Sequence, residues 1–254
     1  MSSTSAKGGP AKTQAPLNSD QFSKLVQGLA DDIVSAHIHW RMHCDLVRAL
    51  NKAHVVGAQS PTFWHYTVRA HEAAALGPLC RAYDQEGSAL HLKNWLEAIR
   101  DNLPLFEREK FRQRLAGNPH VESLAQDHRV PDAHTLAGDI GLVSSSDPLV
   151  KKLQAYRSTA FAHRGVKVTL VGRGNTSAPQ LAVDDVDKLL ERARAILSRY
   201  TILFGAEVHS VHVPGHDDYG YILRTVEENV ARVRREARGR ALLIDPGSAE
   251  APEE

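Results

Sequence analysis

The chain has 254 residues, 42% of them hydrophobic, which is enough for one large domain or two small ones with an ordinary core. Its 31 basic and 30 acidic residues leave a formal net charge of +1, which excludes a global attraction to nucleic acid and makes any RNA contact local. No apolar run is long enough for a membrane span, the first residues lack a secretory signal, and two cysteines are too few for a disulfide framework. We therefore expect a folded cytoplasmic protein without membrane contact.

Both ends of the chain have the composition of disordered tails. Residues 1–18 are mainly Ser, Gly, Pro, Lys and Thr, and residues 241–254 are acidic and contain few groups to bury. Between them, residues 19–240 are predicted to form one helical domain.

A long first helix is predicted from the spacing of apolar residues at threes and fours, with Ser19 as its cap. The residues that form this stripe are Phe22, Leu25, Val26, Leu29, Ile33, Ala36, Trp40, Leu46, Val47 and Leu50.

A second helix is predicted to open at Ser60–Pro61, because serine caps a helix and proline fits its first turn. It runs toward Tyr83, with a kink or break expected at Gly77–Pro78. Shorter helices follow at about 88–101 and 104–116.

Residues 117–147 are punctuated by Pro and Gly and are interpreted as an inserted region of weak helical pieces. Asp147–Pro148 then begins a helix that ends at Gly165, and Asp184 or Asp185 caps another. A final helix covers about 218–238.

The only strand-like run, Val166–Val171, cannot form a sheet by itself, so the fold class is all-α.

The helix after Pro148 carries two chemically capable residues near a predicted buried face. In a helical projection Leu149, Leu153, Tyr156 and Ala160 share one face, and Arg157 and His163 lie on its two flanks. A guanidinium placed there needs acceptors, which an acidic neighbour, an RNA phosphate or a second copy of the helix would supply. His163 falls in the last turn, where an imidazole can titrate near physiological pH.

Two segments carry motifs that are typical of a known family. Arg157 and His163 have the spacing Arg, five residues, His, within the sequence Ala-Phe-Ala-His-Arg-Gly at the end of this helix, and Cys-Arg-Ala-Tyr-Asp (80–84) closes the second helix before Ser-Ala-Leu-His-Leu. Together these motifs resemble the HEPN superfamily, specifically its AbiU-type phage abortive-infection branch. The resemblance covers about 20–205.

The resemblance implies a dimerising helical bundle in which Arg157 and His163 of both protomers form a composite site for metal-independent RNA cleavage. Arg157 would stabilise charge on the transition state, and His163 would move the proton of the attacking 2′-hydroxyl. The expected product is a cyclic phosphate end, and the expected biological role is that of a toxin or phage-defence effector, with an antitoxin or regulatory protein as a further partner. No cofactor is required.

Supporting residues follow from the same comparison. Ser158 stands where active members often carry a polar amide, and Arg164 follows the histidine. Arg81 and Asp84 are one helical turn apart and are interpreted as a polar pair near the cleft, with a purely structural salt bridge as the alternative.

A non-catalytic interpretation stays open beside this one. Arg157 would then bond to an acid on a neighbouring helix and His163 would be a cap or core residue, and the module would serve dimerisation or the binding of a partner or nucleotide.

Histidine groups were weighed as metal sites. His39 and His43, with His37 nearby, have the one-turn spacing of paired zinc ligands but no obvious third ligand, and a second group, His209, His212 and His216, lies in a Pro-Gly loop. The expectation is no metal. The arginine run at 232–240 is interpreted as a solvated helix end, with RNA backbone binding as its alternative.

Overall fold

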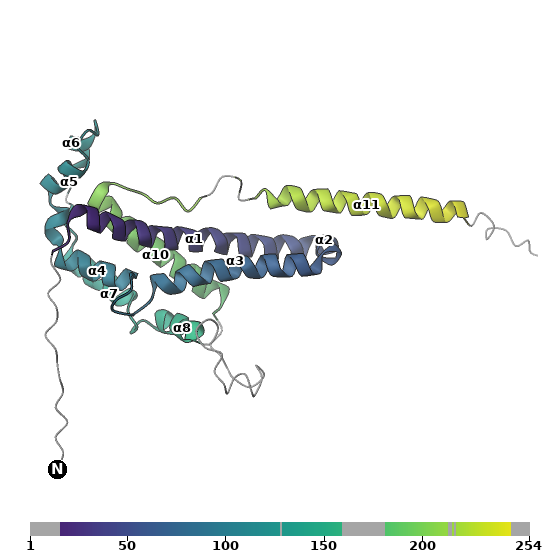
Figure 1. Ribbon diagram of the computed structural model, residues 1–254, viewed down its shortest axis with the longest axis horizontal. Coiled ribbons are helices and arrows are strands. Elements are labelled where there is room, and N and C mark those ends of the chain that lie inside the picture. Colours follow the sequence, from purple (N-terminus) through teal and green to yellow (C-terminus); the bar gives the residue numbers. More distant parts are fainter. Residues whose placement is uncertain (1–15, 128, 159–180, 213–214, 216, 245–254) are drawn as a thin grey trace, which may run out of the picture. The chain divides into compact units, whose positions relative to one another are not determined.

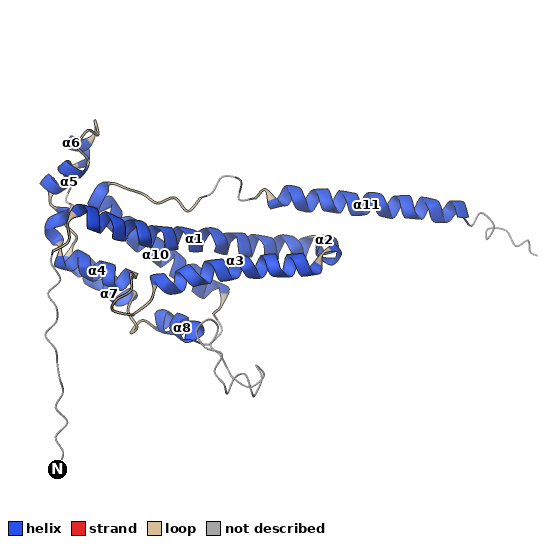
Figure 2. Ribbon diagram, viewed as in Figure 1, coloured by secondary structure: helices blue, strands red, loops and turns tan. Residues whose placement is uncertain are grey.

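The computed structural model describes residues 16–127, 129–158, 181–212, 215 and 217–244. Within these ranges the chain is built of helices and contains no strand (Figures 1 and 2). The predicted all-α fold class is therefore confirmed. The helices separate into two compact units.

Unit 1 comprises residues 1–30, 83–179 and 195–208. It contains the first part of α1 (Ser19–Lys52), the last part of α10 (Val183–Gly205), and the shorter elements α4 (Leu92–Asp101), η1 (Leu103–Phe106), α5 (Arg108–Arg114), α6 (Val121–Leu124), α7 (Ala133–Leu142) and α8 (Pro148–Arg157).

Unit 2 comprises residues 31–82, 180–194 and 209–254. It contains the rest of α1 and α10 together with α2 (His54–Gln59), α3 (Pro61–Ala82) and α11 (Tyr219–Ile244). The predicted disordered tails fall largely outside the described residues.

The start of α1 is fixed by Asn18 rather than by the predicted Ser19. The Asn18 side chain accepts a hydrogen bond from the backbone N–H of Gln21, and the Gln21 side chain accepts one from the backbone N–H of Asn18. This reciprocal pair satisfies two backbone donors at once, as in a capping box. Asparagine is as good a cap as serine, so sequence preference alone could not separate the two positions.

Helix α3 begins at Pro61 as predicted but continues through Pro78 without a break. A proline inside a helix costs about 3 kcal/mol, because it removes a backbone donor and crowds the preceding turn. Here Leu76, Pro78 and Leu79 are all buried. Burial of this turn offsets the local cost.

Aromatic rings from distant parts of the sequence form the centre of unit 1. Phe22 contacts Trp95, Phe106 and Phe204, with ring centroids 6.1, 5.6 and 4.6 Å away. Tyr200 meets the edge of Trp95 at 5.9 Å. These contacts join α1, α4, η1 and α10.

Helix α7 lies in the predicted insertion and packs against α4 within unit 1. Its buried residue Asp139 accepts hydrogen bonds from the Tyr200 hydroxyl, at 2.7 Å, and from the Arg199 guanidinium. The second half of the 117–147 segment is thus bonded to the C-terminal part of α10.

Two arginines occupy the C-terminal end of α10. Arg114 donates to the carbonyl of Phe204 through Nε and Nη2, at 2.9 and 2.6 Å, and Arg129 donates to the carbonyl of Ile202 at 2.9 Å. Cations are favoured there because the last carbonyls of a helix have no partner within the helix and carry partial negative charge. Burial lowers the pKa of Arg114 to about 10.

Unit 2 is held by contacts of α1 with α3 and α10. Nδ1 of His39 lies 3.0 Å from Nδ1 of His71, and His43 donates to the Val68 carbonyl at 3.1 Å. Trp40 on the same helix donates to Asp187 of α10 at 2.6 Å. A second apolar cluster, defined by Leu46, Val56, Trp64 and Leu223, joins α11 to this unit.

Candidate functional site

Arg157 is the last residue of α8, whose start agrees with the sequence prediction. The Asp147 side chain caps the helix by accepting the N–H groups of Leu149 and Val150 at 2.9 and 3.0 Å. The fully buried residues of α8 are Val150 and Leu153, whereas the predicted face residues Leu149 and Tyr156 are half-buried.

The buried face of α8 is therefore rotated relative to the predicted face, and this changes where Arg157 lies. Because Arg157 follows Val150 by two helical turns, it lies on the buried face itself rather than on its flank. The Arg157 side chain is 40% exposed, so solvent or a ligand can still reach it.

Asp84 is the partner of Arg157. It lies just after α3, is 18% exposed, and places Oδ2 2.6 Å from Arg157 Nη1. Its Oδ1 also accepts the backbone N–H groups of Gln85 and Glu86 at 2.7 and 3.3 Å. Burial acts to raise the pKa of the Asp84 carboxyl, but the hydrogen bonds from Arg157 and the two backbone donors outweigh it and hold the pKa below its usual value.

Gln85 ties the loop that carries Asp84 to the segment that leads into α8. Its Nε2 donates to the carbonyls of Tyr83, Asp84 and Val143 at 3.2, 2.8 and 3.0 Å. Its Oε1 accepts the backbone N–H of Ser145 at 3.2 Å. The side-chain amide of Gln85 therefore connects the loop of Asp84 with the segment before α8, the helix that carries Arg157.

The predicted polar pair of Arg81 and Asp84 does not form, because each residue has another partner. Arg81 makes a two-point contact with Asp32, Nε to Oδ2 at 3.1 Å and Nη2 to Oδ1 at 2.6 Å. The planar guanidinium fits both oxygens of one carboxylate, and Asp32 on α1 offers both.

The remaining predicted site residues divide between the described and undescribed parts of the chain. Ser158 caps the end of α8, where its hydroxyl donates to the Gln154 carbonyl at 2.9 Å and its side chain is exposed. His163 and Arg164 lie outside the described residues, as does the predicted helix end at Gly165.

A family model described as AbiU2, within the HEPN group, matches residues 19–224. The chain belongs to this family. No curated protein and no solved structure gives a significant match. The AbiU2 match covers the segments on which the resemblance was based and extends past them into the first turns of α11.

The histidines of α1 have protein partners. His37 donates through Nε2 to the Leu190 carbonyl at 2.9 Å, while His39 and His43 make the contacts with α3 given above. Burial is the main cause that lowers the pKa of His37 and of His71. Over the ranges that the structure describes, no group of three or more metal-ligating side chains is placed to hold an ion. His216 of the second histidine group falls outside those ranges.

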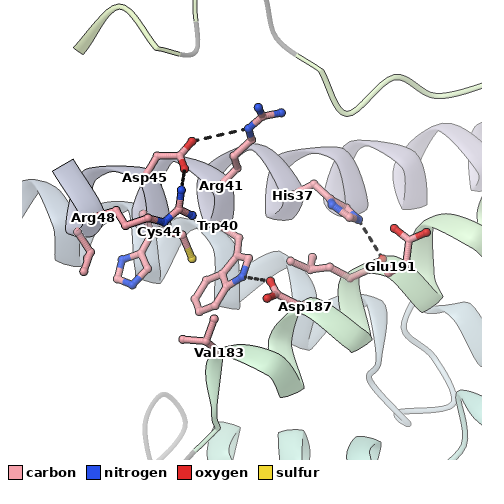
Figure 3. Close-up of a pocket in the computed structure, with 12 residues that line it drawn as sticks. His37, Trp40, Arg41, Cys44, Asp45, Arg48, Val183, Asp187 and Glu191 are labelled. Atoms are coloured by element: carbon pink, nitrogen blue, oxygen red, sulfur yellow. Dashed lines mark hydrogen bonds and ion pairs between the residues drawn. The ribbon is translucent and has the colours of Figure 1, made fainter. Parts of the chain in front are cut away.

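A groove of about 590 Å³ between α1 and α10 in unit 2 was not anticipated from the sequence. The rings of Trp40 and His43, two of its lining residues, stack with centroids 5.2 Å apart. Asp45 pairs with Arg41 and Arg48 at 3.7 and 3.0 Å (Figure 3). Of the other two carboxylates in its lining, Asp187 accepts the Trp40 indole N–H and Glu191 pairs with Arg194, which lies outside the lining. The groove joins sequence segments that no local pattern connects.

Proposed function

We propose that the protein is a metal-independent HEPN endoribonuclease that acts as a toxin or phage-defence effector, with Arg157 and His163 as its catalytic residues in a homodimer. The observation that carries the proposal is the state of Arg157: half-buried, yet accessible, and fixed by a carboxylate that is itself held by the backbone. A cation positioned in advance is what the charge of a phosphoryl transition state requires.

The proposed reaction follows from the chemistry of RNA. The 2′-hydroxyl oxygen attacks the adjacent phosphorus, the bond from phosphorus to the 5′-oxygen breaks, and a cyclic phosphate and a 5′-hydroxyl remain. His163 would accept the proton of the 2′-hydroxyl, and a protonated imidazole would supply one to the leaving oxygen. Arg157 would stabilise the added negative charge on the phosphorus oxygens.

Asp84 is proposed as a positioning residue for Arg157. The carboxylate binds Nη1, which limits the rotamers of a long side chain and reduces the entropy lost when the guanidinium meets phosphate. Ser158 and Arg164 are proposed to support RNA binding.

The test is cleavage of total RNA by purified protein in the presence of EDTA, together with growth inhibition in cells. Arg157→Ala and His163→Ala should each lower the cleavage rate by about 100-fold or more, the scale for loss of a transition-state donor or general base. Asp84→Asn should cause a smaller loss, and the product ends should be cyclic phosphates.

Arg69→Ala is a matched control, because Arg69 also pairs with an acid, Glu72 at 2.7 Å, but on an exposed stretch of α3. It should leave cleavage unchanged. Undiminished cleavage by Arg157→Ala or His163→Ala would remove the catalytic assignment.

A non-catalytic HEPN module is the second candidate, and the Arg157–Asp84 pair favours it because the arginine is bonded to an acid of its own chain. In that case wild-type protein cleaves no RNA, and Asp84→Asn changes only stability or partner binding.

A further inference from the structure

The second half of α11 concentrates positive charge. Among residues 231–240 five are arginine, only Glu236 is acidic, and all ten are exposed. The whole chain carries a formal charge of only +1, so the remaining residues are net acidic. An RNA contact of this protein has to be local, and this stretch has the local charge that such a contact requires.

Three of these arginines share one face of the helix. Arg234 and Arg238 are one turn apart, Arg235 precedes Arg238 by three residues, and the three lie within a sector of about 100°. The contact of α11 with unit 2 lies more than two turns earlier, where Leu223 and Val226 pack on the apolar cluster of that unit. The arginine face is therefore separate from the docked end of the helix. It also lies beyond the AbiU2 match, which ends at residue 224.

The arginine face lacks the acidic partners that arginines have on other helices of the chain. Arg69, Arg112 and Arg194 each pair with a glutamate three residues away in their own helix. On α11 only Arg232 does so, with Glu236 at 2.8 Å, whereas Arg234, Arg235 and Arg238 form no ion pair with a described acid.

The nearest charged neighbours of these three arginines along the helix are instead other arginines. Like charges three or four residues apart destabilise a helix. A bound polyanion would remove this repulsion.

Helix polarity does not account for the cluster. A cation near the C-terminal end of a helix is stabilised by the partial negative charge of the last carbonyl groups, but this effect is confined to the last turn. Helix α11 ends at Ile244, and its last turn contains no basic residue. The arginines lie too early in the helix to benefit.

The chemistry of the cluster favours a phosphate backbone over a lipid surface. Helix α11 contains no lysine, and the planar guanidinium of arginine offers two parallel N–H groups to phosphate oxygens. Helices that lie on membranes combine a basic face with large apolar residues such as Trp, Phe or Leu. Between residues 227 and 240 the apolar side chains are those of Val230, Ala231, Val233 and Ala237, which offer little surface for insertion.

We propose that Arg234, Arg235 and Arg238 bind the phosphate backbone of RNA. Each guanidinium displaces a counterion from one phosphate, so the contact is independent of base sequence and weakens as the salt concentration rises. The proposal rests on RNA as the substrate of the proposed ribonuclease, but the contact requires neither Arg157 nor His163.

The experiment is fluorescence anisotropy of labelled single-stranded 2′-O-methyl RNA with full-length protein over a salt series. This probe lacks the 2′-hydroxyl that the proposed cleavage requires, so binding is measured apart from catalysis. The triple variant Arg234→Gln, Arg235→Gln, Arg238→Gln removes three charges but keeps residues that favour a helix. It should raise the Kd by about tenfold or more for probes of two different sequences.

The salt dependence gives a second measure from the same titrations. The slope of log affinity against log salt concentration should become shallower by about 2 in the triple variant, because each phosphate contact on a single strand contributes about 0.7.

The matched control is the triple variant Arg48→Gln, Arg69→Gln, Arg100→Gln, which makes the same change in net charge at exposed arginines that pair with acids. It should bind the probe as the wild type does. Wild-type protein that does not bind the probe, or an equal Kd and salt slope for wild type and the α11 variant, would overturn the proposal. So would an equal loss of binding in both triple variants.

Phosphatidylserine vesicles test the lipid alternative. Vesicle binding that the α11 variant loses while its RNA binding is unchanged would mark the arginine face as a lipid contact and overturn the proposal. Binding of the 2′-O-methyl probe through these arginines, without cleavage of ordinary RNA by the wild type, would remove the proposed ribonuclease activity and support the backbone contact.

Discussion

At the scale of single residues, the buried carboxylate of Asp139 in unit 1 is paired with residues that are distant in the sequence. Asp139 is 5% exposed and accepts the Tyr200 hydroxyl, which is itself buried. Burial and the neighbouring Asp139 carboxylate both raise the pKa of Tyr200, so the phenol stays protonated and remains a donor.

Tyr200→Phe should therefore lower the free energy of unfolding by about 1–2 kcal/mol, because Asp139 loses a donor in a buried setting while the ring contacts persist. Urea denaturation measures the change. Tyr221→Phe, at a residue that is 68% exposed, is the control and should leave the midpoint unchanged. Equal midpoints for both variants would argue against a stabilising Asp139–Tyr200 bond.

The ion pair of Arg157 illustrates what sequence could and could not predict at this scale. An arginine near an apolar face has to meet an acceptor, which follows from desolvation alone. Which of the chain's 30 acidic residues supplies it depends on the packing of two distant segments. Asp84 was identified as a supporting residue from the family resemblance, but its bond to Arg157 was not.

At the scale of elements, the C-terminal end of α10 depends on side chains supplied from elsewhere in the chain. Arg129 is 6% exposed, donates to Ile202 of α10 and to the Leu124 carbonyl, and lies 4.3 Å from the Phe111 ring centre. Such a residue stabilises a helix end through both charge and contact.

Arg129→Met should lower the free energy of unfolding by about 2 kcal/mol or more, because two carbonyls lose their donor while similar volume is kept. Arg108→Met is the comparison, since Arg108 also donates to a carbonyl, that of Gln126, from an exposed position. Thermal unfolding should show a clear decrease for the first variant only; the same small shift in both would mean that burial of Arg129 has no special effect.

Helix starts were easier to predict than helix interiors. Pro61 and Asp147 were identified because proline at the first turn and aspartate at a cap act locally. The break that was one of the two outcomes expected at Pro78 is absent because the buried packing of this turn offsets the cost of the proline. Helix α2 was missed because a short helix has little periodicity.

At the scale of the whole molecule, histidines whose pKa is lowered occur in both units. Burial is the largest cause lowering the pKa of His37 and His71 in unit 2 and of His91 in unit 1. His91 is 1% exposed, donates through Nε2 to the Glu86 carbonyl and accepts the Asn94 N–H through Nδ1. Protonation of Nδ1 would remove this helix cap.

Stability should consequently decrease on mild acidification. Between pH 6.5 and the lowered native pKa values, the unfolded chain binds more protons than the native chain. The contribution of these histidines to the free energy of unfolding is therefore at its maximum above about pH 6.5 and decreases below it. Urea titrations at pH 7.5, 6.5 and 5.5 measure the slope of the free energy of unfolding against pH. His37→Gln, which keeps a donor for Leu190, should flatten it; constant or rising stability toward pH 5.5 would contradict the linkage.

The fold class was predictable because helical periodicity runs through the chain, and family membership because two short segments carried recognisable residues. The separation into two units was not, since α1 and α10 each contribute to both units and no change in composition marks the boundary. In the parts that the structure describes, no helix is both long and apolar enough to cross a bilayer.

Gln85 has a consequence for the chemical ageing of the protein. Hydrolysis of its amide to a carboxylate would replace the group that faces the carbonyls of Tyr83, Asp84 and Val143 by an anion. Repulsion would then separate the Asp84 loop from the segment before α8. A slow covalent lesion at this amide, next to the carboxylate that binds Arg157, would loosen the arginine.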